Sequence, residues 1–212
     1  MEVRSTGLIL RTRPLTETSL IVQWLTPELG RIATAAKGAR RPKSPFAGKL
    51  DLFHVAEFAF VRSRRSDLHT LREAVLRETF PALRTDLRRL QRAAYLARLV
   101  EATTETETPL PAVHALLLDA VRQIAGSASR PETVLAFELR LLAELGLAPP
   151  LDRDSLPRPG AHELAGHLAT RPWDDLASAD REAVAAVARF LHGFLIHHLE
   201  RLPSGRGDAL TP

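Results

Sequence analysis

The chain of 212 residues contains no cysteine and only three lysines. Without cysteine it can form no disulfide, use no thiolate nucleophile and build no zinc or iron–sulfur site with sulfur ligands. It also lacks a run of about 18 apolar residues, the length that a membrane-spanning helix needs. Arg4, Arg11 and Arg13 interrupt the apolar N-terminal stretch, which argues against a signal peptide. A cytoplasmic protein is therefore expected.

The composition is that of a globular protein, with 45% hydrophobic and 25% charged residues. The charge is unevenly divided, however. Residues 1–80 carry 14 Lys+Arg and 8 Asp+Glu, a net charge of +6, whereas residues 81–212 carry 15 and 17, a net charge of −2. This asymmetry favours a polyanionic partner for the N-terminal half, either nucleic acid or an anionic membrane surface. A basic surface that serves only solubility is the alternative.

The N-terminal part has the pattern of short β-strands separated by turn residues. Five strands are predicted, at Leu8–Thr12, Leu20–Thr26, Gly30–Ala35, Leu50–Val61 and Leu68–Ala74. The alternation of apolar residues changes phase near Ala56–Glu57, which predicts a β-bulge. Trp24 shares a face with Leu20 and Val22 and is expected in the core. The pattern fits a five-stranded OB-type barrel, whereas the strands are too long for an SH3-like barrel.

From Pro81 onwards the apolar residues follow a helical period. Four helices are predicted: one with a buried stripe of Leu83, Leu87, Leu90 and Ala94, a second from Pro109–Pro111 to Gly126, a third from Pro131 to a C-cap at Gly146, and a fourth from near Ser178 to about Leu202. Residues 151–175 are rich in proline, glycine and histidine and are predicted to be a loop. The tail 204–212 is expected to fray. The predicted fold class is therefore α+β, with an OB-fold nucleic-acid-binding domain at 1–79 and an α-helical domain at 80–212.

Two basic stretches of the N-terminal half are candidate sites for binding a polyanion such as nucleic acid. The first holds Arg31, Lys37, Arg40, Arg41, Lys43 and Lys49, with no acidic residue from Leu29 to Leu50. Glycines and prolines make it a loop, which can follow a phosphate backbone by charge and backbone N–H groups. The turn after the fourth strand adds Arg62, Arg64 and Arg65. An exposed basic loop without a ligand is the alternative.

A second candidate surface is a stripe of arginines on the first helix. Arg84, Arg88 and Arg92 are four residues apart and share a face, with Tyr95 close by. They could bind nucleic acid or an acidic peptide. A solvated face that pairs with nearby carboxylates is the alternative.

The sequence predicts no catalytic residue, metal or other cofactor. No serine lies in a nucleophile elbow, and no phosphate-binding P-loop is present. His162 and His167 are five residues apart, as are His192 and His197, and this spacing does not place two ligands on one helix face. We expect elemental analysis of the dialysed protein to find no stoichiometric zinc; finding it would implicate His162 and His167.

Several motifs together resemble one family. They are Glu17–Val22, Leu25–Arg31, Lys37–Arg41, Leu68–Glu73 and Phe137–Pro149. Their order is similar to that of the RecO family, the bacterial recombination mediators of DNA repair. The resemblance implies an OB-fold followed by a helical domain in a nucleoid-associated protein without enzymatic activity or membrane attachment. It also implies binding of single- and double-stranded DNA and annealing of complementary strands.

The implied partners are RecR and the single-stranded-DNA-binding protein, with which such proteins load the RecA recombinase. By position in the family's motifs, the first candidates for phosphate contacts are Lys37, Arg40 and Arg41. The stripe Arg84, Arg88, Arg92 would bind the acidic C-terminal tail of the single-stranded-DNA-binding protein. Many relatives carry a four-cysteine zinc insert, but here Asp154 stands about where its first cysteine would be, so the zinc site is lost. An OB-fold adaptor that binds RNA or anionic surfaces without annealing is the alternative function.

Overall fold

The computed structural model describes residues 2–126, 129–176, 179–199 and 202–211. The chain forms two compact units. The barrel unit comprises Met1–Pro81 and Thr104–Ala115, and the helical unit comprises Ala82–Thr103 and Leu116–Pro212. The predicted boundary falls between residues 79 and 80, whereas the structure divides the chain after Pro81. Residues Thr104–Ala115 also belong to the barrel unit, although no sequence pattern indicated this.

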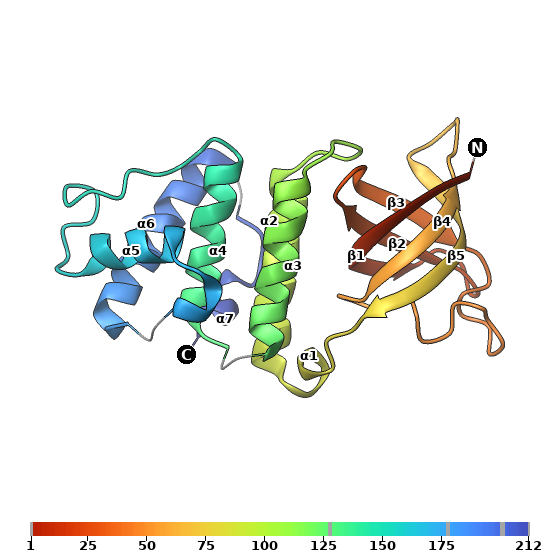
Figure 1. Ribbon diagram of the computed structural model, residues 1–212, viewed down its shortest axis with the longest axis horizontal. Helices are drawn as coiled ribbons and strands as arrows, with labels where there is room; N and C mark the ends of the chain where they lie inside the picture. The colour runs from red at the N-terminus through yellow and green to blue at the C-terminus, as the bar shows by residue number, and fades with distance from the viewer. Residues whose placement is uncertain (1, 127–128, 177–178, 200–201, 212) are drawn as a thin grey trace. The chain divides into compact units, whose positions relative to one another are not determined.

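The barrel unit is a closed five-stranded barrel (Figure 1). Its strands are β1 (Glu2–Pro14), β2 (Leu20–Thr26), β3 (Gly30–Ala36), β4 (Val55–Val61) and β5 (Leu68–Glu78). They close in the order β1-β2-β3-β5-β4. The pairing of β3 with β5 is parallel and all the other pairings are antiparallel. The prediction of a five-stranded OB-like barrel is therefore confirmed.

The strand that turns the corner of the barrel is β1. It spans 13 residues, more than the five predicted, because it pairs with β4 over Glu2–Leu8 and with β2 over Leu8–Pro14. A register shift between Ile9 and Arg11 accompanies the change of partner. The bulge predicted near Ala56–Glu57 corresponds to two irregularities in the β4–β5 pairing, after Val55 and after Ala59.

A column of aromatic rings fills the barrel interior. Trp24 stacks on Phe58 at 4.0 Å between ring centroids, Phe58 on Phe60 at 5.8 Å, and Phe60 on His69 at 5.1 Å. Trp24 is 0% exposed, and its Nε1 donates a hydrogen bond of 2.8 Å to Thr34 Oγ1. The prediction that Trp24 belongs to the core is confirmed. The buried indole N–H is satisfied, as a core tryptophan requires.

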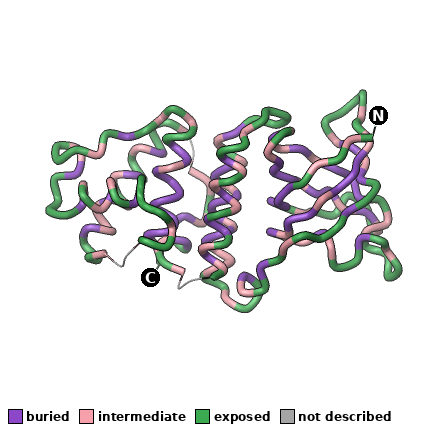
Figure 2. The backbone as a smooth tube through the Cα atoms, in the orientation of Figure 1, coloured by how far each residue is buried: buried purple, intermediate pink, exposed green. Residues whose placement is uncertain are grey.

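The remaining elements are helices. They are α1 (Ala82–Thr85), α2 (Leu87–Thr103), α3 (Pro111–Gly126), α4 (Pro131–Glu144), α5 (Ala161–Thr170), the 3-10 helix η1 (Trp173–Asp175), α6 (Arg181–Leu199) and α7 (Arg206–Ala209). α4 is the centre of the helical unit, since it contacts α2, α5 and α6 and is buried along most of its length (Figure 2). No described helix is both long and apolar enough to cross a lipid bilayer.

The first predicted helix is wrong in two respects. The Asp86 carboxylate accepts hydrogen bonds from the backbone N–H groups of Arg88 and Arg89, so a new helix starts at Leu87. This break interrupts the predicted apolar stripe, and Leu87 is 67% exposed. The buried face of α2 is formed instead by residues such as Leu96 and Val100.

The ends of the later helices follow local signals more closely. Gly146, at φ 73°, ends α4 as predicted: its N–H bonds Ala143 O, and the N–H of Leu147 bonds Leu142 O. The predicted start near Ser178 lies outside the described residues, and the described α6 begins at Arg181. The loop predicted at residues 151–175 is wrong in part, because it contains α5 and η1.

The C-terminal tail, predicted to fray, is held by buried arginines. Arg206 donates hydrogen bonds of 2.7 and 2.8 Å to the two carboxylate oxygens of Glu138, which is 0% exposed. The Tyr95 hydroxyl donates to the same carboxylate at 2.6 Å. Burial and the adjacent Glu138 charge raise the pKa of Tyr95. Arg92 donates to the backbone carbonyls of Ala209 and Thr211. The tail therefore completes the core of the helical unit.

The buried pair predicts a large loss of stability when one partner is removed. Arg206→Met leaves the Glu138 carboxylate buried without its cation, and we expect the free energy of unfolding to fall by about 3–5 kcal/mol. Arg189→Met, on the exposed side of α6, should change it by less than about 0.5 kcal/mol. Urea unfolding followed by circular dichroism measures both. Similar midpoints for the two variants would contradict a structural role for the pair.

Candidate nucleic-acid interface

One group of exposed cations lies on the loop between β3 and β4. This basic loop, residues 37–49, carries Lys37, Arg40, Arg41 and Lys43, all exposed, and Lys49, which is half-buried. Within the described part of the chain, none of the five forms an ion pair with a carboxylate. Their positive charge is therefore directed to solvent.

The basic loop is ordered although its cations are exposed. Phe46, within the loop, and Leu50, directly after it, are buried in the barrel core. The backbone N–H of Arg40 bonds Thr18 O at 3.0 Å, which ties the loop to the connection between β1 and β2. Gly38 has a φ of 69°, a conformation that favours glycine. Apolar anchors and turn geometry thus hold the cations at one end of the barrel.

A second group lies on the loop between β4 and β5, where Arg62, Arg64 and Arg65 are exposed. The Ser63 hydroxyl accepts a hydrogen bond from the Arg65 N–H at 3.3 Å, which shapes the turn. Arg62 Nη1 lies 3.7 Å from Glu107 Oε2. No ion pair of Arg64 or Arg65 is found among the described residues.

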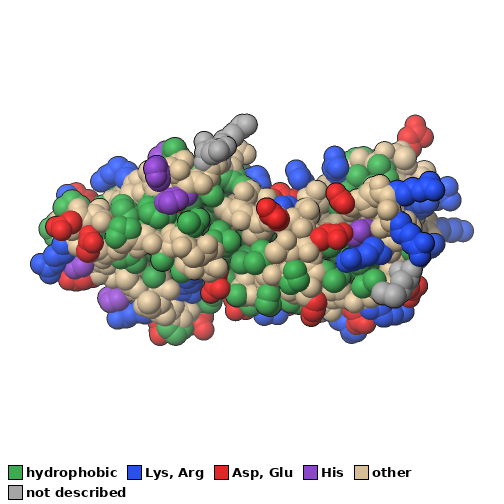
Figure 3. All heavy atoms as spheres, turned by 90° about the horizontal axis from the view of Figure 1, so that it is seen from above, with side chains coloured by type: hydrophobic (Ala, Val, Ile, Leu, Met, Phe, Trp, Pro, Cys, Tyr) green, Lys and Arg blue, Asp and Glu red, His purple; other side chains and the backbone are tan. Residues whose placement is uncertain are grey.

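The two basic groups are at opposite ends of the barrel. The basic loop precedes β4 and the second group follows it, and seven residues of β-strand extend about 20 Å. Figure 1 shows the two loops leaving different sides of the barrel, and Figure 3 shows Lys and Arg side chains gathered over the barrel part of the viewed face. Apart from Arg31, the predicted DNA-binding residues therefore form two patches, the basic loop and the second patch of Arg62, Arg64 and Arg65, separated by the length of a strand.

Arg31 belongs to neither patch. It lies on β3, within the strand predicted at Gly30–Ala35, six residues before Lys37. Its guanidinium donates a hydrogen bond to the backbone carbonyl of Thr104, so the side chain holds a neighbouring segment. The strand, and not the basic loop, therefore positions Arg31, and its contact with DNA stays a prediction.

A pocket lies on the barrel beside the loop between β4 and β5, which contributes Asp67 to it. Leu10, Gln23, Arg31, Ala33, Asp67, Thr106 and Glu107 are among its lining residues. Gln23 and Ala33 are paired across β2 and β3, whose outer face is the surface that OB-folds use for oligonucleotides. The segment Thr104–Thr108, named here the return segment, forms one wall.

The return segment is the feature that sequence reasoning missed. Thr106 forms a parallel β-bridge with Arg31, and the Glu107 N–H bonds Arg31 O at 2.9 Å. Gly30, at φ 64°, allows the approach, because a Cβ at this position would lie 1.9 Å from Thr108 O. The only sequence signal is the Thr/Glu-rich composition of residues 103–108, which does not reveal a contact with a strand more than 70 residues away.

The arginine stripe of the helical unit is only partly formed. Arg84 and Arg88 are exposed, but Arg92 is 1% exposed and Tyr95 is 0% exposed. The prediction that Arg92 and Tyr95 face a partner is wrong, since both polar groups serve the internal contacts of the tail. In the described residues, no three His, Asp or Glu side chains are grouped so that they could hold a metal.

Comparisons with known proteins agree with this architecture. The family model of the recombination protein O N-terminal region matches residues 1–80, and that of the C-terminal region matches residues 84–158. A protein of Exiguobacterium sibiricum is 30% identical over 208 residues, covering 94% of this chain and 81% of that protein. A protein of Rhodopirellula baltica is 37% identical over 147 residues, covering 69% of this chain and 54% of that protein. Both are named DNA repair protein RecO.

The fold therefore defines a protein with an OB-like barrel and a following helical region. The chain belongs to the RecO family of DNA repair proteins. The matches to relatives from Rhodopirellula baltica, Salinibacter ruber and Pelotomaculum thermopropionicum span 54%, 58% and 58% of those proteins.

The buried position of Trp24 predicts its spectroscopic behaviour. The chain has two tryptophans, so Trp173→Phe isolates the emission of Trp24. We expect this emission to be insensitive to acrylamide and to oligothymidine, because the indole is stacked inside the barrel. Trp24→Phe, which isolates Trp173, is the matched comparison. Strong quenching by oligothymidine in Trp173→Phe would show that Trp24 stacks on bases.

Proposed function

We propose that this chain binds single- and double-stranded DNA through the basic loop, anneals complementary strands and acts without catalysis. The observation that carries the proposal is the set of five loop cations that project from an ordered end of the barrel without ion pairs among the described residues. Cations of this kind bind phosphates and release the counterions condensed on DNA, which makes binding favourable for any sequence.

Annealing follows from the same kind of contact. Cations that bind phosphates leave the base edges available for pairing and reduce the repulsion between two strands. The second patch, with Arg64 and Arg65, lies about 20 Å from the basic loop along β4. We propose that the two patches bind separate backbones or separate parts of one strand.

The partners are proposed from membership of the RecO family. The chain would act with RecR and the single-stranded-DNA-binding protein in loading RecA at sites of DNA repair. Arg84 and Arg88, the exposed members of the stripe, are the proposed contacts for the acidic C-terminal tail of the single-stranded-DNA-binding protein.

Replacing Lys37, Arg40 and Arg41 by alanine should weaken DNA binding for every sequence. The plot of log affinity against log salt has a negative slope. If each cation contacts one phosphate, the loss of three contacts should make this slope shallower by about 2 to 3. Fluorescence anisotropy with labelled single- and double-stranded oligonucleotides, over a range of NaCl concentrations, measures this slope. Annealing of complementary strands should slow in parallel.

A triple variant of Arg153, Arg181 and Arg189 to alanine is the matched control, because it removes the same charge from exposed sites of the helical unit. The control should keep the wild-type salt slope. Equal slopes for both triple variants would contradict the proposed interface. Tight binding of RNA without annealing of DNA would favour an RNA-binding adaptor instead.

A further inference from the structure

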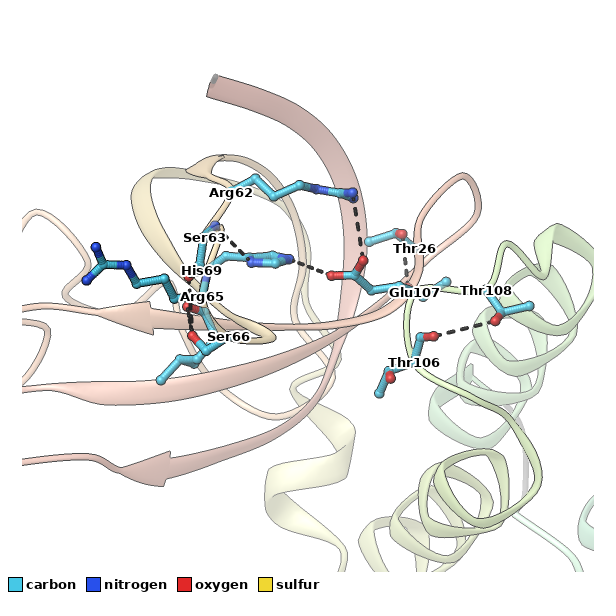
Figure 4. Close-up of polar contacts among 11 residues, drawn as sticks. Thr26, Arg62, Ser63, Arg65, Ser66, His69, Thr106, Glu107 and Thr108 are labelled. Atoms are coloured by element: carbon cyan, nitrogen blue, oxygen red, sulfur yellow. Dashed lines mark hydrogen bonds and ion pairs between the residues drawn. The ribbon is translucent and has the colours of Figure 1, made fainter.

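Glu107 holds an unusual position at the barrel end that carries the second patch (Figure 4). Its carboxylate accepts a hydrogen bond from His69 Nε2 at 2.9 Å and lies 3.7 Å from Arg62 Nη1. Its backbone has a φ of 56°, a left-handed conformation that is uncommon for residues with a side chain. Such a conformation persists only where surrounding contacts hold it.

His69 offers a fixed hydrogen-bond donor at this place. The side chain is 2% exposed and its ring stacks on Phe60. Nδ1 accepts a hydrogen bond of 3.4 Å from the Ser63 N–H, so Nε2 carries the ring hydrogen and donates it to Glu107. A buried donor needs an acceptor, and a phosphate oxygen meets this need as well as a carboxylate oxygen does.

The carboxylate itself is accessible to solvent. Glu107 and Arg62 have side chains that are 37% and 45% exposed. The exposed Arg62–Glu107 ion pair contributes little to stability, so an anion that also accepts the hydrogen bond from the buried His69 can replace the carboxylate at small cost. Arg64 and Arg65 on the same loop attract anions to this end of the barrel. Asp67 is the one acidic residue in the sequence of this loop, residues 62–67.

We propose that Arg62 and His69 form a phosphate-binding site that Glu107 occupies until DNA binds. A backbone phosphate of DNA displaces the Glu107 carboxylate, takes the hydrogen bond from His69 Nε2 and pairs with the Arg62 guanidinium. The inference rests on the proposed DNA binding and adds that the Glu107 carboxylate competes with the DNA phosphate for one site.

Displacement of Glu107 would also change the pocket on β2 and β3. Thr106 and Glu107 form part of its wall. The hydrogen bond from the Glu107 N–H to Arg31 O helps to hold the return segment to β3. Displacement of the Glu107 side chain therefore changes the wall of the pocket on the outer face of β2 and β3.

Two glutamates of the return segment allow a matched experiment. Glu107→Gln removes the carboxylate that competes for the site, whereas Glu105→Gln removes the same charge from an exposed residue two positions earlier. Binding of labelled oligothymidine is measured by anisotropy across NaCl concentrations. Relative to Glu105→Gln, we expect Glu107→Gln to bind about three to ten times more tightly at about 50 mM salt, with a slope steeper by about 0.7.

Arg62→Gln tests whether this gain arises at the proposed site. In the Arg62→Gln background, Glu107→Gln and Glu105→Gln should bind oligothymidine equally. Glu107→Asp provides a second route, because its shorter carboxylate keeps the net charge but withdraws from His69. We expect it to bind more tightly than the wild type, and it replaces Glu107→Gln if that variant does not fold.

The outcomes separate the two proposals. In one contrary result, the wild type binds DNA while Glu107→Gln and Glu105→Gln bind oligothymidine with equal affinity. In another, the gain in affinity survives Arg62→Gln. Either result would show that the Glu107 carboxylate does not compete with phosphate, and the DNA-binding proposal would stand. If none of the folded proteins binds DNA, the proposed function fails and the competitor fails with it.

Discussion

Because β1 pairs with β4 over its first half and with β2 over its second half, one 13-residue strand closes the barrel. The strand order β1-β2-β3-β5-β4 combines these pairings of β1 with the parallel pairing of β3 and β5, and it determines where each connection emerges. The basic loop and the connection between β1 and β2 lie at one end, as the bond from Arg40 to Thr18 shows. The connection between β4 and β5, with Arg62, emerges at the other end. The distribution of positive charge is thus a consequence of strand pairing.

The return segment depends on the same geometry. Closure brings His69 of β5 beside β3, where its parallel partner is Thr34, and leaves its ring at the end of the aromatic column. Glu107 can then reach His69 while its backbone bonds Arg31. One acidic segment therefore contacts a strand, a buried ring and an exposed arginine at once. The barrel core and a candidate phosphate site are connected through a single imidazole.

The helical unit is organised around buried charge. Glu138 lies on α4, which is buried along most of its length, and a buried carboxylate requires paired hydrogen-bond donors. Arg206 and Tyr95 provide them from segments that are distant in sequence. Arg92 satisfies the last carbonyls of the chain. Short α7 is held by these contacts, since four residues are too few to form a stable isolated helix.

Local patterns in the sequence were sufficient for the elements whose signals are local. β2, the start of α4 at Pro131, the C-cap at Gly146 and the burial of Trp24 all follow from short-range periodicity and turn chemistry. The motifs also identified the RecO family and the exposed cations of the basic loop. Only the tertiary structure decided which charged residues are buried and which segments meet. Arg92 has the spacing of a surface stripe, and Glu107 the composition of an exposed loop. Arg92 bonds Thr211 and Glu107 bonds His69 only because folding of the helical unit and closure of the barrel bring together residues that are far apart in sequence. No local pattern encodes these contacts.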